Sequence, residues 1–444
     1  MPHKPALNLI GAVGDPCADT RTDYALDLLS VVNIALCNNP QTREVWANSR
    51  AQAAQVGVAR ASYLPSASAT LSANRSTPGN SQRIASLNLS YLLYDFGARA
   101  ANLENARQTL ASVIATQDSV VQTLFLTSVQ AYYQTRATLA AYDATIVSER
   151  AAQASFAAAN ARYLAGSATP ADKLAAQTAY SQASLNRITA NGAMKIAQGN
   201  LANILALDAN VNVSLVAAQG GSPAAPDEER LKIFDQNIAA LIEEARRNRP
   251  DLQAAQATVL AAEATADAAR AAGKPVISVT GAANQSNSAG INTHASTLGL
   301  SMSIPLFSGF APTYRIRAAE AQIETRKAQL ERLRLQVALD VWTAYQNLIT
   351  AAQNRRTTAD LLDNAEQSER VALGRYKAGM GIMLDVLNAQ TTLASARQQR
   401  IQAALNWNVA RATLAQAMGS LDAGLLQTLP DSVTEMDIST SHKP

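Results

Sequence analysis

Asp172 and Asp385 are the two residues whose type and spacing could do chemistry. They lie 213 positions apart, and each follows a short glycine-containing turn at the start of a long apolar-periodic run. A carboxylate in the first turn of a helix accepts backbone N–H groups and complements the positive helix end. Taken singly, each aspartate is therefore interpreted as a helix-start acid. In a symmetric oligomer the matched positions would form a ring of carboxylates, which makes a shared function credible.

The sequence carries no pattern typical of an enzyme or of a cofactor site. Its three histidines are His3, His294 and His442, and no Cys/His spacing suits a metal. It has no glycine loop that would cradle a phosphate and no nucleophile elbow. The net charge of +3 is small and the basic residues are dispersed among acidic ones, which disfavours a nucleic-acid partner. We expect neither catalysis nor a cofactor nor a bound metal.

Cys17 and Cys37 are the only cysteines of the chain. A disulfide between them would close a loop of roughly 20 residues and contribute about 3 kcal/mol in an oxidising compartment. Two unpaired thiols are the alternative. Lipid attachment at Cys17 is disfavoured because residues 13–16 before it do not form an apolar, small-residue processing site.

The turn before each aspartate belongs to a stretch that occurs twice. The motif Arg-Tyr-x-Ala-Gly spans Arg162–Gly166 and again Arg375–Gly379. The two copies are 213 residues apart, the same spacing as between the two aspartates. Upstream the offset falls to 210, as between Pro40 and Pro250, so a three-residue difference lies in the region between. The chain is thus two copies of one design. We predict an N-terminal extension (1–23), a first repeat (24–208), a linker (209–235), a second repeat (236–420) and a C-terminal tail (421–444).

Each copy contains a helix of unusual predicted length. The runs 98–165 and 312–378 have almost no proline or glycine, and at about 1.5 Å per residue each would extend roughly 100 Å. Shorter runs, 169–207 and 382–418, would return antiparallel, so the aspartate turns become the tips of two helical hairpins. Apolar residues recur every seven positions, which predicts a coiled-coil seam. They are Ile316, Ile323, Leu330, Val337, Ala344 and Ala351.

Four segments alternate between apolar and polar residues, which predicts strands with one face of each kind. They are 66–75, 84–94, 276–285 and 295–305. Each has about ten residues, the length of a tilted membrane-spanning strand, and the polar faces carry Ser, Thr and Asn as a water-filled lumen would. Four strands cannot close a barrel, whose minimum is about eight, so several chains would share one. The alternative is two hairpins packed on a soluble core.

The sequence contains no stretch of about 20 uninterrupted apolar residues, so it predicts no transmembrane helix.

Several motifs together resemble the TolC-type outer-membrane factor (outer membrane efflux protein) family over residues 24–420. They are Asn38-Asn39-Pro40, Asn248-Arg249-Pro250, Ser303–Gly309 and the stretch from Arg375-Tyr376 through Leu384–Ala389. The fold implied is mainly α with a membrane β-barrel. It is a homotrimeric channel-tunnel in which each chain, with two structural repeats, contributes four strands to the shared barrel and long helices to a periplasmic tunnel. The resemblance also implies an outer-membrane location and docking with a periplasmic adaptor and an inner-membrane ABC transporter or RND pump.

The same resemblance assigns roles to the tips, which would form the periplasmic entrance. Asp385 matches the first of two acids that line the entrance constriction, with Asp172 at the equivalent tip position; the second acid is Asn388 here. Tyr376 matches a tyrosine that helps to hold the entrance shut, and the other latch candidates are Arg375, Arg162 and Tyr163. The family's arginine and threonine partners appear as Gly381 and Ala171. We therefore expect a looser entrance that binds cations more weakly.

Three functions remain open at this stage. The Asp15-Pro16-Cys17 start and residues 36–43 resemble the branch of the family that serves type I secretion of RTX toxins such as cyclolysin (adenylate cyclase toxin). A multidrug efflux duct has the same architecture and would export small molecules instead. A soluble coiled-coil scaffold is the alternative of another class.

Overall fold

The computed structural model describes residues 25–75, 77, 81–216, 238–288 and 290–421. The chain forms two compact units, and each takes segments from both sequence copies. The sheet unit comprises 44–117 and 250–335, and the hairpin unit comprises residues up to 43, 118–249 and those from 336 onward. Within the described ranges, no helix combines the length and apolar character that crossing a lipid bilayer requires.

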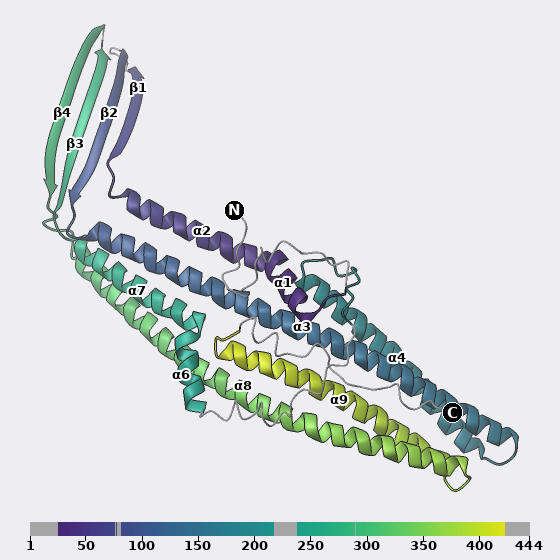
Figure 1. The fold of residues 1–444 in the computed structure, drawn as a ribbon. Coiled ribbons are helices and arrows are strands. Elements are labelled where there is room, and N and C mark those ends of the chain that lie inside the picture. Colours follow the sequence, from purple (N-terminus) through teal and green to yellow (C-terminus); the bar gives the residue numbers. More distant parts are fainter. Residues whose placement is uncertain (1–24, 76, 78–80, 217–237, 289, 422–444) are drawn as a thin grey trace. The chain divides into compact units, whose positions relative to one another are not determined.

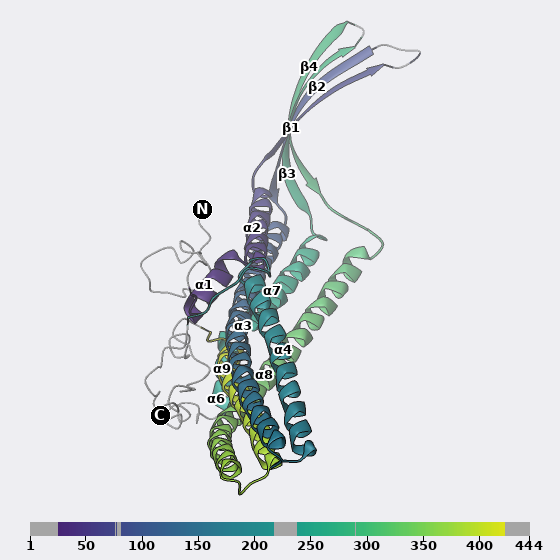
Figure 2. The same cartoon turned by 90° about the vertical axis from the view of Figure 1, so that its right-hand side faces the viewer.

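Four antiparallel strands make up the sheet. They are β1 (Ser66–Arg75), β2 (Ser81–Tyr94), β3 (Val276–Ser288) and β4 (Ile291–Ser303), in the order β1-β2-β3-β4 (Figures 1 and 2). β2 and β3 come from different copies and pair along most of their length. β4 ends at Ser303, before the predicted end at 305, since Pro305 has no N–H for the ladder. It also begins earlier than the predicted 295, because residues 291–294 already pair with β3.

The register sorts the side chains into the two predicted faces. In the middle of β1, β2 and β3, residues of like character are paired across the strands, as in the sets Ala69–Leu87–Ala283 and Thr70–Ser86–Asn284. Toward the hairpin turns the pairing is mixed, as between Ala85 and Gln285. The apolar face is exposed, with large residues such as Leu87, Leu298 and Leu300 open to the surroundings. Among the described residues, no strand pairs with the outer edge of β1 or of β4. An apolar, open-edged sheet is incomplete by itself, because unpaired edges and exposed apolar surface both favour association.

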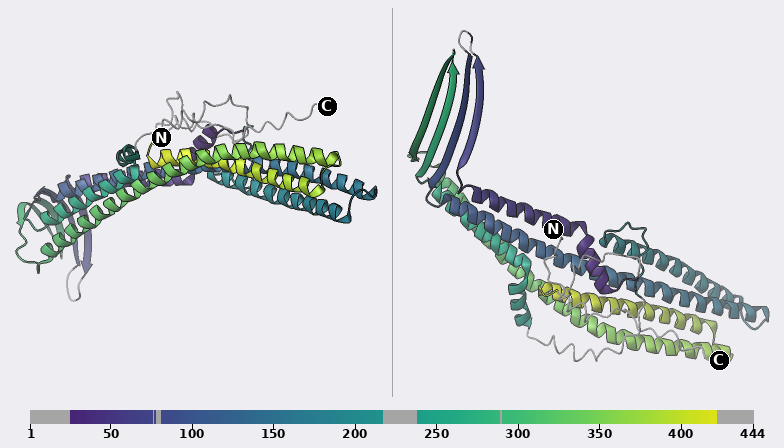
Figure 3. Two further views of the ribbon diagram at one scale, coloured as in Figure 1. Left: turned by 90° about the horizontal axis from the view of Figure 1, so that it is seen from below. Right: turned by 45° about the horizontal axis from the view of Figure 1, so that its top comes forward.

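Long helices form the rest of the molecule. The hairpins are α3 (Ala98–Leu164) with α4 (Pro170–Ile204), and α8 (Ala311–Lys377) with α9 (Met383–Ala417). Figure 3 shows both turns at the same end of the hairpin unit. The shorter helices are α1 (Leu28–Asn38), α2 (Pro40–Ala61), α6 (Ile238–Asn248) and α7 (Pro250–Ala271). On α8 the seven-residue positions Val337, Ala344 and Ala351 are buried.

The core of the hairpin unit lies where α1 packs on the middle of α3 and the ends of α4 and α9. Its largest buried side chains on α3 are Phe125, Tyr132 and Tyr133. The predicted Asn-Pro motif has a clear structural role here. Asn39 caps α2 by accepting from the Gln41 N–H at 2.9 Å, and its amide donates to the Ile204 carbonyl at 3.2 Å.

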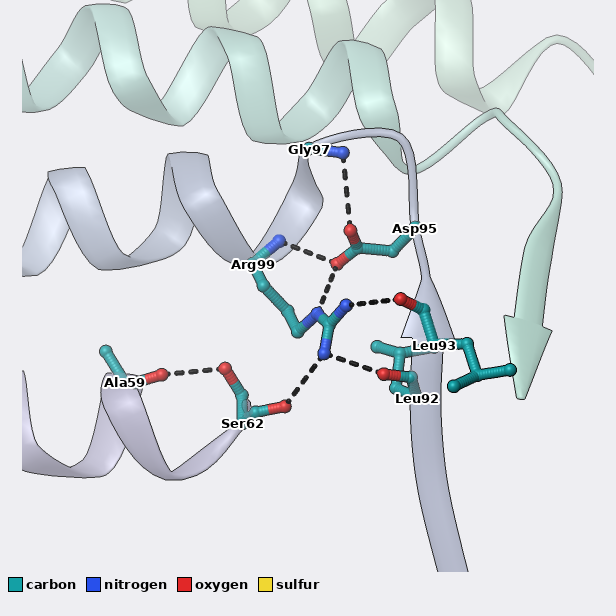
Figure 4. Close-up of polar contacts among 7 residues, drawn as sticks. All are labelled: Ala59, Ser62, Leu92, Leu93, Asp95, Gly97 and Arg99. Carbon is teal, nitrogen blue, oxygen red and sulfur yellow. Dashed lines mark hydrogen bonds and ion pairs between the residues drawn. The ribbon is translucent and has the colours of Figure 1, made fainter. Parts of the chain in front are cut away.

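Arg99 joins β2 to α3 in the sheet unit (Figure 4). Its guanidinium donates to the carbonyls of Leu92 at 2.8 Å and Leu93 at 3.1 Å, where the ladder is irregular. Asp95 caps the helix by accepting the Arg99 N–H at 2.8 Å, and pairs with the same guanidinium at 3.2 Å. In the second copy, the positions equivalent to Asp95 and Arg99 are Ser308 and Pro312, which cannot form this ion pair or donate to the strand carbonyls.

Candidate functional site at the hairpin tips

The two tips have the same backbone. We call Arg162–Asp172 the first tip and Arg375–Asp385 the second tip. In each, a glycine with positive φ ends the long helix, Gly166 at 70° and Gly379 at 76°. The turn is closed by equivalent bonds, Ser167 N–H to the Arg162 carbonyl and Met380 N–H to the Arg375 carbonyl, both 2.9 Å. This αL ending satisfies helix carbonyls and needs glycine, which explains the repeated Ala-Gly.

Arg162 of the first tip clamps the second tip. Its guanidinium donates to the Tyr376 carbonyl at 2.8 Å and lies 4.1 Å from the centre of the Tyr376 ring. A further contact reaches the Lys377 carbonyl at 3.4 Å. These carbonyls belong to the last turn of α8, where a cation also complements the negative helix end. Two of the four latch candidates are therefore brought together within one chain.

An apolar cluster lies behind this clamp. It joins both hairpins and contains Ala159, Ala176, Tyr376, Met383, Val386 and Leu387. Tyr376 is only 6% exposed, and its hydroxyl is buried without a hydrogen-bond partner among the described residues. The ring therefore contributes mainly through packing and through the cation above it.

Asp172 is engaged in a helix cap. Its carboxylate accepts from the Thr169 N–H at 3.1 Å and from the Thr169 hydroxyl at 2.7 Å, while its own N–H donates back at 3.2 Å. This reciprocal arrangement is a capping box. The interpretation of Asp172 as a helix-start acid accounts for all these contacts.

Asp385 occupies the equivalent place in α9 without such a partner. The preceding residue at the cap is Ile382, which has no side-chain acceptor, so the box cannot form. Asp385 is exposed, and its carboxylate makes no hydrogen bond with the described residues. Asn388 lies one turn further on, also exposed. The carboxylate is thus free to face a ligand or another chain.

The other two latch candidates do not meet within the chain. Arg375 is exposed, and its guanidinium makes no hydrogen bond to a described residue. Tyr163 is 37% exposed, and the Lys173 ammonium lies 5.0 Å from its ring centre.

The loop of the second tip comes close to the end of α8 at Gly381, the position at which the resemblance predicts an arginine. A Cβ built on Gly381 would lie 3.2 Å from the Tyr376 nitrogen and from the Arg375 Cβ. The loop therefore passes too close to the end of α8 to accept a side chain at Gly381 without a shift.

Cys17, one partner of the predicted disulfide with Cys37, lies outside the described residues, so that pairing stays a prediction.

Three polar contacts behind the tips were not predicted from the sequence. Ser155 on α3 and Gln390 on α9 bond to each other, with the Gln390 amide donating at 3.0 Å. Within the first hairpin, Glu149 accepts from Ser184 and from Arg187, the latter at 2.6 Å, and these hydrogen bonds lower the pKa of the Glu149 carboxyl. Repetition could have singled out Ser155 and Gln390 as residues, because they recur at the 213-residue offset as Ser368 and Gln177, but it does not indicate that they touch.

The fold and tips can now be compared with known proteins. The structure superposes on the Campylobacter jejuni CmeC outer membrane channel with a TM-score of 0.78 at 16% identity, covering 92% of this chain and 90% of CmeC. The fold is therefore that of an outer membrane channel-tunnel. The sequence profile described as outer membrane efflux protein matches residues 31–207 and 241–420.

Full-length relatives agree with the profile. Protein CyaE of Bordetella pertussis is 32% identical over 92% of this chain and 88% of its own length. The toluene efflux pump outer membrane protein TtgC of Pseudomonas putida is 26% identical, over 88% of this chain and 82% of its own. The chain belongs to the outer membrane efflux protein family. Members are outer-membrane channel proteins that form homotrimers and pair with periplasmic adaptors and inner-membrane transporters.

Proposed function

We propose that this chain is the outer-membrane duct of a tripartite export system. Three copies would share one barrel of four strands each, and their helical hairpins would form a periplasmic tunnel. An inner-membrane transporter and its adaptor would dock at the tunnel end. The observation that carries the proposal is the sheet, which has an exposed, mainly apolar face for lipid, a polar face for a lumen and, among the described residues, two unpaired edges.

The tips are proposed as the closed entrance of this duct. Asp385, with Asn388 beside it, would line the constriction and contribute three carboxylates per trimer. Asp172 is given a structural part in this proposal, because its carboxylate is already occupied by the Thr169 cap. Arg162 and Tyr376 would form the latch inside each chain.

We propose an RTX-type protein toxin as the exported substrate, with an ABC transporter as the inner-membrane partner. The N-terminal segments that resemble the type I secretion branch support this choice, and so does the higher identity to Protein CyaE than to TtgC. The second candidate is small-molecule efflux through an RND-type pump. It is favoured by the efflux relative, which aligns over most of both chains.

Two experiments test the function. Detergent-extracted protein reconstituted into planar bilayers should give uniform trimer-sized conductance steps, and a protein without conductance would refute the duct. Deleting the chain in its host should abolish toxin in the medium while leaving drug sensitivity unchanged. The reverse pattern, with toxin still secreted and sensitivity increased, would assign the chain to efflux instead.

A further inference from the structure

The hairpin unit contains a groove that belongs neither to the tips nor to the core. It has a volume of about 590 Å³ and is lined by α3, α4 and α9. Half of the lining residues carry a side-chain amide, and the rest are apolar apart from Thr127. The amides are Gln130 and Gln134 on α3, Asn200 and Asn203 on α4, and Gln402 and Asn406 on α9. Among the described residues, no ionisable or aromatic side chain lines the groove.

Most of these amides keep their hydrogen-bonding groups available. The Gln402 amide donates to the Asn406 side chain at 2.8 Å, which leaves each of the two with further donors and acceptors. The side chains of the four amides on α3 and α4 form no hydrogen bond with the described residues. Because every amide carries both N–H donors and a C=O acceptor, this lining suits a neutral ligand that offers both kinds of group.

The groove lies on the side of α3 that faces away from α1. Phe125 of α3 is buried in the core that includes α1. Gln134 follows Phe125 by about two and a half helical turns, so its side chain points to the opposite side of the helix. The wall of the proposed tunnel is one helix thick, and an added helix such as α1 can lie only outside it if the bore is to stay open. The groove therefore opens to the bore, and three copies bring three grooves to one level.

The spacing of the amides matches that of an extended polypeptide. Gln130 and Gln134 are four residues apart on their helix, which separates them by about 6 Å along its axis. Gln402 and Asn406 have the same spacing on α9. In an extended chain, backbone groups on one side repeat every two residues, or about 6.6 Å. A chain that runs along these helices therefore meets successive amides with successive backbone groups, and the apolar lining residues beside them contact its side chains.

We propose that this groove is a binding site for an extended polypeptide in transit through the duct. The amides bond to backbone N–H and C=O groups, which every sequence offers, and a neutral lining does not select for the charge of the side chains. Single hydrogen bonds of this kind are weak, so the chain is held briefly and then released, as transport requires. This inference rests on the proposed duct and commits it to a polypeptide substrate.

Blockade of single trimers by a peptide tests the site. A neutral, unstructured peptide built from Gly, Ser and Thr is added to planar bilayers that hold the full-length protein. Gln134→Leu with Asn203→Leu should shorten the mean blockade about tenfold, because two hydrogen-bonding amides are lost. The matched control, Asn347→Leu with Gln416→Leu, changes the counterparts 213 positions on, which do not line the groove, and should leave the duration unchanged. Equal durations in the two variants would overturn the site, while a conducting trimer would still support the duct.

A second probe needs no substitution and so does not depend on the folding of a variant. The same peptide with N-methyl groups on alternate residues lacks every second backbone donor, and the unmodified protein should release it about tenfold faster. Equal durations for the two peptides would contradict the backbone contacts. A neutral oligosaccharide of similar length is the remaining comparison. If it blocks for longer than the peptide, and Gln134→Leu with Asn203→Leu shortens that blockade, the groove binds sugar and the inference fails.

Discussion

The first tip and the second tip share a backbone and differ in which groups they leave free. Both end a long helix at a left-handed glycine and start the return helix with an aspartate at its third position. In the first tip the aspartate is held by the Thr169 cap and the arginine clamps the other hairpin. In the second tip Asp385 and Arg375 have no such contacts. Duplication has preserved the geometry while separating structural from outward-facing roles.

This difference has a consequence for the entrance. Polar side chains that already have hydrogen-bond partners inside the chain are held in place by them. Charged side chains without such partners are available to ions and to neighbouring chains. The first tip is therefore the fixed element and the second tip is the responsive one. Substitutions at matched positions should separate the two roles.

Tyr376→Ala is expected to have the largest effect. Removing a buried aromatic ring should cost about 3 kcal/mol, because the cavity collapses only partly and the Arg162 cation loses its ring. Hydrogen exchange of the tip amides in the detergent-solubilised trimer would measure the loss. Tyr163→Ala, at the matched position, should accelerate exchange less; an equal effect would contradict the assigned difference between the tips.

Arg162→Ala should have the next largest effect, about 2 kcal/mol, since the terminal carbonyls of α8 lose a charged donor. We expect longer open times in single-channel recordings. Arg162→Lys keeps the charge but not the planar group that stacks on Tyr376, so it should lie between the two. Recordings of Arg162→Ala that match the unmodified channel would exclude the clamp as a latch.

Asp385→Asn should weaken block by multivalent cations about tenfold, which corresponds to about 1.4 kcal/mol. The exposed carboxylate is the group that a cation in the constriction would meet. Asp172→Asn removes a carboxylate of the same type at the matched position, but one that is occupied by its cap. It should leave block unchanged and destabilise only the start of α4, and strong block that survives Asp385→Asn would refute the carboxylate ring.

The sequence predicted the hairpins and strands because long-range repetition and local periodicity both act on whole segments. Apolar residues that recur every two positions predict the strands, and those that recur every seven predict the packed face of α8. The Arg-Tyr-x-Ala-Gly motif marks both turns. Asp172 is hydrogen-bonded in a helix cap and Asp385 is not, and this difference depends on one neighbour each, Thr169 and Ile382. The hydrogen bonds of the cap, and with them this difference, were seen only in the structure. The Arg162 clamp joins residues more than 200 positions apart, which no local pattern reveals.

Ile382→Thr should convert the second tip to the chemistry of the first. The hydroxyl oxygen of a threonine at this position can accept a hydrogen bond from the Asp385 N–H. The Asp385 carboxylate can in turn accept hydrogen bonds from the threonine N–H and hydroxyl, because the backbone at Ile382 already has the cap conformation of Thr169. The cap should stabilise α9 by about 1 kcal/mol. It should also draw Asp385 away from the constriction and weaken cation block without any change of charge. Unchanged block together with higher stability would show that Asp385 binds cations from its capped position.

Gly381→Ala should have the smallest effect, because two opposing contributions nearly cancel. An added Cβ would press on the backbone at Tyr376 and the Arg375 side chain from 3.2 Å, which destabilises the second tip. The less flexible unfolded chain offsets about 0.4–1 kcal/mol of that cost. We expect a net loss of about 0.5 kcal/mol in denaturant unfolding, whereas Ala168→Gly at the matched position should lose a similar amount through chain entropy alone. The two substitutions are distinguished by open times, which Gly381→Ala alone should lengthen, since it displaces the end of α8 that Arg162 clamps.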